Sequence, residues 1–141
     1  MKRVMGLDIG EKRIGIAFSD LLGFTAQGHS VYARRQEEED IAYLAGLAKE
    51  RDVSRIVFGL PKNMNGTEGP QAEKVRAFAK SVSEAAPDAT IAFWDERLTT
   101  VAAHKVMIEA DMSRNKRKKK VDQLAAVLIL QGYLDHLQIR M

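Results

Sequence analysis

The stretch that most constrains the fold lies between residues 3 and 20. Two runs rich in β-branched and large apolar residues, 4–9 and 14–18, flank a polar turn at 10–13, a pattern that predicts a β-hairpin. The first run contains Asp8, and a carboxylate is costly to bury unless a partner compensates its charge. Asp8 either caps the turn with its side chain or points from a central strand at a metal ion. The glycines two residues to either side favour the metal, because they let another backbone or a ligand approach closely.

The rest of the chain alternates strands with helices. A third antiparallel strand is predicted at 24–32, and two short apolar runs at 55–60 and 90–94 predict strands covered on both faces. Apolar residues at helical spacing predict helices from 37 to near 52, between the prolines at 70 and 87, after 99 or 100 as far as 110, and over 121–137. The last of these is apolar around most of its circumference and is expected to be buried. The order predicts one α/β domain over residues 1–141, a mixed sheet with helices on both faces.

Composition excludes several classes of protein. The 141 residues include no cysteine, so disulfides and thiolate metal sites are excluded. Acidic residues interrupt the early apolar run, which is unlike a signal peptide, and no apolar run approaches the roughly 20 residues that a membrane span needs. We expect a cytoplasmic protein with no membrane partner.

The basic residues are concentrated in one place. Six of the seven residues at 114–120 are Lys or Arg, and of the 22 basic residues in the chain they leave 16 against 19 acidic ones. Such a run is either a contact for a phosphate backbone or a solvated linker, which charge runs more often are.

Three acids stand where the apolar pattern disfavours them: Asp8 in the first strand, Glu96 just after the strand at 90–94, and Asp122 at the start of the last helix. Asp122 shares a helix face with Ala125 and Ala126, whose small side chains would let that helix lie close to the sheet. Each acid also has an ordinary explanation, which is a turn cap for Asp8, a surface ion pair with Arg97 or another base for Glu96, and a helix cap for Asp122.

Carboxylates from separate elements suit hard, oxygen-preferring cations such as Mg²⁺ or Mn²⁺. Two such ions ~3.5–4 Å apart activate a water and stabilise the leaving oxygen in hydrolysis of a phosphodiester. In this scheme Asp8 bridges two ions, while Glu96 and Asp122 each help to hold one.

With these residues in view, the chain resembles the YqgF/RuvX family of the ribonuclease H-like superfamily nearly from end to end. The resemblance is carried by GLDIG at 6–10, RIGIA at 13–17, GLP at 59–61 with Asn63, NGTE at 65–68, DERLTT at 95–100, and KVD at 120–122 with Ala125 and Ala126. It implies an RNase H-like fold with five strands, of which the first three are antiparallel and the last two parallel. It also implies catalytic and metal-binding acids at Asp8, Glu96 and Asp122.

The resemblance implies an endonuclease that processes the 5′ end of pre-16S ribosomal RNA, as a monomer or homodimer. The candidate substrate-binding residues are Lys62, Asn63, Asn65, Arg97, Arg117, Lys118, Lys119 and Lys120. One alternative is a Holliday junction resolvase acting on DNA, which would need a dimer because two symmetric cuts need two sites. Another is a nucleic-acid-binding module without catalysis.

Overall fold

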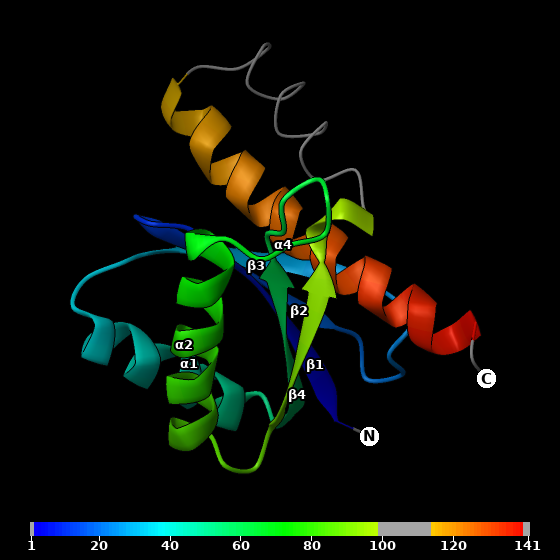
Figure 1. The fold of residues 1–141 in the computed structure, drawn as a ribbon. Helices are drawn as coiled ribbons and strands as arrows, with labels where there is room; N and C mark the ends of the chain where they lie inside the picture. Colours follow the sequence, from blue (N-terminus) through cyan, green and yellow to red (C-terminus); the bar gives the residue numbers. More distant parts are fainter. Residues whose placement is uncertain (1, 99–113, 140–141) are drawn as a thin grey trace.

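The computed structural model of the chain describes residues 2–98 and 114–139, with the backbone alone at 114–122 and 138–139. Its centre is one sheet with the strand order β3-β2-β1-β4-β5 (Figure 1). The strands are β1 (Arg3–Ile9), β2 (Arg13–Ser19), β3 (Ala26–Ala33), β4 (Val53–Leu60) and β5 (Thr90–Asp95).

The strand directions follow from the connections. β2 pairs antiparallel with β1 and with β3, whereas β4 pairs parallel with β1 and with β5. A short turn returns the chain antiparallel, and a parallel neighbour requires a crossover, here supplied by a helix. The predicted RNase H-like sheet, with its first three strands antiparallel and its last two parallel, is confirmed.

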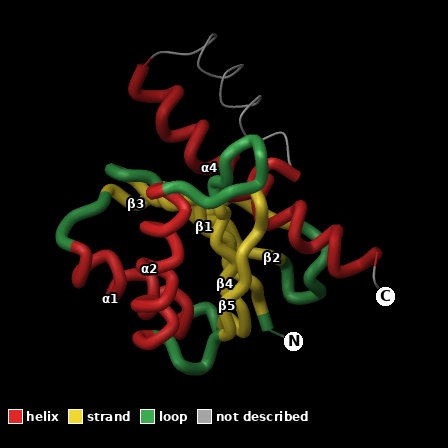
Figure 2. Tube along the Cα trace, viewed as in Figure 1, coloured by secondary structure: helices red, strands yellow, loops and turns green. Residues whose placement is uncertain are grey.

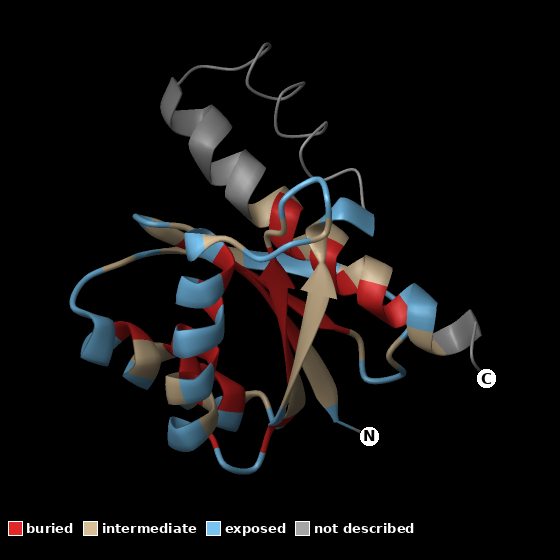
Figure 3. Ribbon diagram, viewed as in Figure 1, coloured by how far each residue is buried: buried red, intermediate tan, exposed pale blue. Residues whose placement is uncertain are grey.

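Helices cover both faces of the sheet, as predicted. α1 (Glu37–Glu50) and α2 (Pro70–Ala85) pack on one face, and α4 (Arg114–Ile139) crosses the other (Figures 1 and 2). Buried side chains gather between each helical layer and the sheet (Figure 3). Successive residues of β1 face opposite sides of the sheet. Met5 and Leu7 lie in the core under α1 and α2, whereas Gly6 contacts α4.

Gly6 lets α4 lie directly against the sheet. A Cβ atom at this position would be 3.3 Å from the carbonyl oxygen of Ala126, and the alanine pair at 125–126 is buried. The prediction that small residues bring this helix close is therefore confirmed. Gly10 serves the hairpin turn, because a Cβ atom there would lie 2.7 Å from the carbonyl oxygen of Arg13, which accepts a hydrogen bond from the Gly10 N–H. Both glycines beside Asp8 thus have roles in the fold that require no metal.

The last helix differs from its prediction in two ways. It begins at Arg114 rather than at residue 121, so the basic run is its first two turns and not a linker. Lys and Arg have high helix propensity, and an apolar stripe further along holds the helix on the sheet. That stripe covers one face, since the buried residues are paired at a four-residue repeat: Ala125 and Ala126, Ile129 and Leu130, Tyr133 and Leu134. The flanks are half-buried, and 135–136 are exposed.

Other boundaries shift by a few residues. β3 begins at Ala26 rather than at residue 24, because the Asp20 carboxylate accepts hydrogen bonds from the N–H groups of Phe24 and Thr25 and holds a turn there. β4 begins two residues earlier than predicted and β5 extends to Asp95. The helix predicted to end at 110 lies outside the described residues. In the part of the chain that the structure describes, none of the helices could span a bilayer.

Candidate active site

Asp8 lies near the C-terminal end of β1 and is only 7% exposed. Its partner on β2 is Gly15, and because Leu7 pairs with Phe58, its neighbour on β4 is Gly59. Asp8 follows Gly6 by two residues, so both are on the sheet face covered by α4. The residues beside Asp8 on the two adjacent strands are thus glycines, which contribute no side chains of their own.

Glu96 approaches the same place from β5. It is the first residue of η1 (Glu96–Leu98), the 3₁₀ turn that follows this strand. One carboxylate oxygen of Glu96 lies 2.9 Å from the position of a Cβ atom on Gly59, and Ile129 of α4 lies against the same position. Glu96 therefore reaches back over β4, which is about 4.8 Å from β1. Asp8 and Glu96 share one edge and one face of the sheet.

The third predicted acid is placed by its backbone. Asp122 is one helical turn before Ala126, which packs over Gly6, and it occupies the same side of α4 as Ala126 and Ile129. Its side chain lies outside the described atoms. The convergence of Asp122 with Asp8 and Glu96 stays a prediction, which the placement of the helix favours.

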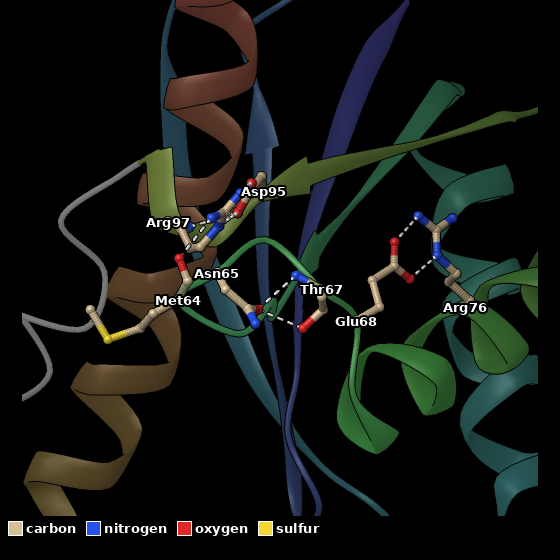
Figure 4. A network of polar contacts seen from close by, with 7 residues as sticks. All are labelled: Met64, Asn65, Thr67, Glu68, Arg76, Asp95 and Arg97. Carbon is tan, nitrogen blue, oxygen red and sulfur yellow. Dashed lines mark hydrogen bonds and ion pairs between the residues drawn. The ribbon is translucent and has the colours of Figure 1, made fainter.

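Arg97 pairs with a neighbour other than Glu96. Its guanidinium donates to both carboxylate oxygens of Asp95, with a shortest distance of 2.8 Å from Nη2 to Oδ2 (Figure 4). These hydrogen bonds outweigh the effect of burial and hold the pKa of Asp95 below its usual value. Of the basic residues considered as partners of Glu96, Arg97 is therefore engaged by Asp95.

Arg97 also fastens the loop between β4 and α2 to this turn. Its Nη1 donates to the carbonyl oxygen of Met64 at 3.2 Å. Within the loop, the Asn65 side chain accepts from both the backbone N–H and the hydroxyl of Thr67, and the Asn63 amide donates to that hydroxyl at 2.9 Å. At the far end Glu68 pairs with Arg76 of α2 (Figure 4).

The predicted substrate-binding residues thus fall into two groups. Lys62, Asn63, Asn65 and Arg97 lie in or against the loop beside Glu96, and the last three already hold the loop together. The basic residues at 117–120 lie in the first turns of α4, immediately before Asp122, with side chains outside the described atoms. Contact of either group with a substrate stays a prediction.

Sequence reasoning missed a buried ion pair behind the hairpin. Arg34 donates to Asp40 at 3.0 Å and to the carbonyl oxygen of Gly10 at 2.9 Å, which braces the turn two residues after Asp8. Asp40 is fully buried, yet it stands in a run of four acids that resembles an ordinary first helical turn. Gly59, inside an apolar strand, was a further sequence signal of a close approach, here by Glu96 and Ile129.

The carboxylates of Asp8 and Glu96 are suited to a hard divalent cation. Asp8 and Glu96 offer carboxylate oxygens on one face, with no thiolate in the chain to favour a softer metal. Among the described side chains, which exclude residue 122, no group of three possible ligands lies together. The predicted third ligand, Asp122, has its side chain outside the described atoms.

Comparisons with known proteins place the chain among nucleases. A family model described as "RuvX: Holliday junction resolvase" matches residues 2–136. A relative from Clostridium beijerinckii is 58% identical over 133 residues, covering 94% of this chain and 96% of its own. A relative from Clostridioides difficile is 57% identical, with 94% of each chain covered. Both carry the name "Putative pre-16S rRNA nuclease".

Solved structures with a similar fold include two of Thermus thermophilus RuvC. The one in complex with a Holliday junction substrate has a TM-score of 0.61 at 14% identity and covers 96% of both chains. The other has a TM-score of 0.55 at 15% identity and covers 95% of this chain and 96% of its own. At these identities the likeness establishes a shared fold.

Proposed function

This chain belongs to the RuvX family, and we propose that it is an endonuclease that hydrolyses phosphodiester bonds in structured nucleic acid with the help of Mg²⁺ or Mn²⁺. We further propose that its substrate is the 5′ end of the 16S ribosomal RNA precursor. The observation that carries the proposal is the placement of two carboxylates, Asp8 and Glu96, over glycines at one edge of the sheet.

In this proposal the three acids hold the cation and the chain positions the substrate. Asp8 would help to hold both of the predicted ions, and Glu96 and Asp122 would each help to hold one. When bound, the metal lowers the pKa of a water and stabilises charge on the phosphate oxygens. Because Asp8 is nearly excluded from solvent, the interaction between its carboxylate and a cation is screened little by water.

The basic turns of α4 have a separate task. They precede Asp122 directly, and their positive charge attracts the phosphate backbone by release of counterions, without regard to sequence. The loop beside Glu96 contributes Lys62 and the ordered amides around Asn63 and Asn65. These groups would hold the scissile strand against the acids.

The names carried by the relatives support an RNA substrate, since they specify pre-16S rRNA. A second candidate is resolution of four-way DNA junctions, which is supported by the description of the family model and by the fold shared with RuvC. This reaction would require two copies of the chain, one for each strand that is cut.

A side-by-side cleavage assay tests the proposal. Purified protein is given a 5′-extended 16S precursor RNA and a four-way DNA junction, each with Mg²⁺, with Mn²⁺ and with chelator. We expect metal-dependent cleavage of the RNA that is abolished in Asp8→Asn. Cleavage of the junction alone would favour the second candidate. Binding without cleavage of either substrate would leave a nucleic-acid-binding module and contradict the proposal.

A further inference from the structure

Met64, at the tip of the loop between β4 and α2, is an unusual feature of the surface near the acids. Its side chain is 97% exposed, the largest exposed fraction among the large hydrophobic residues described. A single exposed apolar side chain needs no special explanation. Met64 differs because the structure fixes its backbone and places it beside the candidate active site.

The loop is closed by its own hydrogen bonds. The backbone N–H of Asn63 donates to the carbonyl oxygen of Thr67 at 2.9 Å, and that of Gly66 donates to the carbonyl oxygen of Asn63 at 2.9 Å. The side chains of Asn63, Asn65 and Thr67 add three more bonds inside the same turn. Met64 lies within this closed turn, so little conformational freedom of its backbone remains to be given up on binding.

A second contact joins this turn to η1, the element that carries Glu96. The carbonyl oxygen of Met64 accepts a hydrogen bond from Arg97, and Arg97 also donates to the Asp95 carboxylate (Figure 4). Arg97 is the residue after Glu96 in the chain. The Met64 side chain points away from the loop, while its main chain faces the turn that carries Glu96 (Figure 4). Leu98, at the end of the same turn, is 66% exposed. Met64 and Leu98 are thus exposed apolar residues on two elements that Arg97 joins, one of which carries Glu96.

The other exposed large hydrophobic residues in the described chain lie elsewhere. Leu21, Leu22 and Phe24 belong to the turn between β2 and β3. Because β1 and β2 are antiparallel, this turn is at the opposite end of the sheet from Asp8. Exposed apolar surface next to the acids is thus supplied by Met64 and Leu98.

From this arrangement we infer that Met64 is a wedge that packs against a nucleobase beside the scissile phosphate. The inference rests on the proposed nuclease function. Apolar side chains, Met among them, insert between base steps and partially unstack them, and contact with the face of a base tolerates any sequence because every base has such a face. Lys62, two residues earlier, supplies a positive charge for the adjoining phosphate. The wedge would hold a flipped or unstacked nucleotide, which favours substrates with single-stranded or distorted ends.

The test uses an RNA hairpin with a single-stranded 5′ extension, carrying 2-aminopurine at one position at a time. Fluorescence of this base rises when it is unstacked. Binding is measured with Asp8→Asn protein, so that the probe is not cut, and single-turnover cleavage is measured with Asp8 intact. Met64→Ser removes the apolar side chain, Met64→Leu retains it, and Leu22→Ser is the matched control at the other end of the sheet.

We expect a fluorescence rise at one position that Met64→Ser abolishes and Met64→Leu retains. Cleavage by Met64→Ser should fall by roughly tenfold or more, as for removal of one stacking partner, with the melting temperature unchanged. Leu22→Ser should match the parent.

Cleavage and fluorescence that Met64→Ser leaves unchanged would overturn the wedge alone. A melting temperature lowered by Met64→Ser and restored by Met64→Leu would mean that Met64 packs on its own chain, which also overturns the wedge. A parent that neither binds nor cuts the RNA would overturn the nuclease proposal with it.

Discussion

At position 59 the sheet has room for a hydrogen atom and no larger group. A Cβ atom there would meet the Glu96 carboxylate from one side and Ile129 of α4 from the other. The Ile129 side chain is the nearer of the two and is buried, so a larger residue would displace both Ile129 and the Glu96 carboxylate. This glycine connects the packing of the sheet to the geometry of the candidate site.

We predict that Gly59→Ala impairs cleavage more than it impairs folding. Overpacking should lower the free energy of unfolding by about 1–2 kcal/mol, while a carboxylate moved by about 1 Å should slow cleavage by ~100-fold. Denaturant unfolding and single-turnover cleavage measure the two effects.

The control is Gly46→Ala in α1, where no atom lies within 4 Å of the new Cβ. It should stabilise the protein by roughly 0.5–1 kcal/mol and leave cleavage unchanged. Full cleavage by Gly59→Ala would contradict this role of the glycine.

The buried pair of Arg34 and Asp40 gives the stability a defined pH dependence. Burial alone would raise the pKa of Asp40, but hydrogen bonds from the Arg35 N–H, Arg34 and Tyr32 outweigh it and hold the pKa below 3.8. A carboxyl group whose pKa is lower in the folded state stabilises that state above its unfolded pKa. The contribution disappears as the pH falls through the folded value.

We therefore predict that Asp40→Asn costs about 3 kcal/mol of unfolding free energy at pH 7, because it leaves Arg34 without its charge partner. The difference in unfolding free energy between the variant and the parent should narrow below about pH 4, as Asp40 of the parent becomes protonated. Unfolding curves from pH 7 to pH 3 measure it. Glu39→Gln is the control, since Glu39 makes a long, exposed pair of 4.0 Å with Arg35 and should change stability by less than about 1 kcal/mol. A difference that stays constant with pH would contradict the account.

At the scale of elements, α4 joins two tasks in one helix. Its apolar stripe packs on Gly6 and Gly59 of the sheet, and its first two turns carry the basic run before Asp122. A rigid helix fixes the charge relative to the acid, which a linker would not. The position of the basic residues is therefore set by the packing of Ala126 and Ile129.

We predict that changing Lys118, Lys119 and Lys120 together to Ala weakens binding of RNA and DNA regardless of sequence. The slope of log affinity against log salt should fall by roughly one unit for each phosphate that the variant no longer neutralises. Alanine is a strong helix former, so the helix should persist, which circular dichroism verifies. Lys2, Lys49 and Lys80 lie before β1, at the end of α1 and in α2, and their triple replacement by Ala is the control. An unchanged salt slope in the first variant would remove the basic run from the binding surface.

The elements could be predicted more fully than their ends and contacts. Residue periodicity identified the hairpin, α1, α2 and the parallel strands, because burial on one or both faces leaves a direct mark on sequence. It misplaced the start of α4, since a run of Lys and Arg suits a solvated helix as well as a linker. Sequence reasoning assigned no partner to Asp40 or Asp95 and offered Arg97 only to Glu96. Several opposite charges lie within reach of each arginine along the chain, and the folded backbone decides between them.

At the scale of the whole molecule, the fold brings acids from distant parts of the sequence to one edge of the sheet. The parallel pairing of β1, β4 and β5 aligns their C-terminal ends, which is where Asp8 and Glu96 lie. The sequence resemblance predicted the sheet, which is confirmed, and it named both acids, whose catalytic role stays a prediction. The hydrogen bond by which Arg97 holds the loop, and the exposed Met64 in that loop, were not predicted.

Melting curves of the parent and of Asp8→Asn, each with chelator and with Mg²⁺ or Mn²⁺, test the central claim most directly. Without metal, like charges at a shared site repel one another, so Asp8→Asn should be as stable as the parent or more stable. Metal should raise the melting temperature of the parent by mass action and that of the variant much less. Glu73→Gln, which changes an acid in the first turn of α2, should respond to metal as the parent does. A variant clearly less stable than the parent in chelator, together with a parent that metal does not stabilise, would contradict the metal site and restore Asp8 to a structural role.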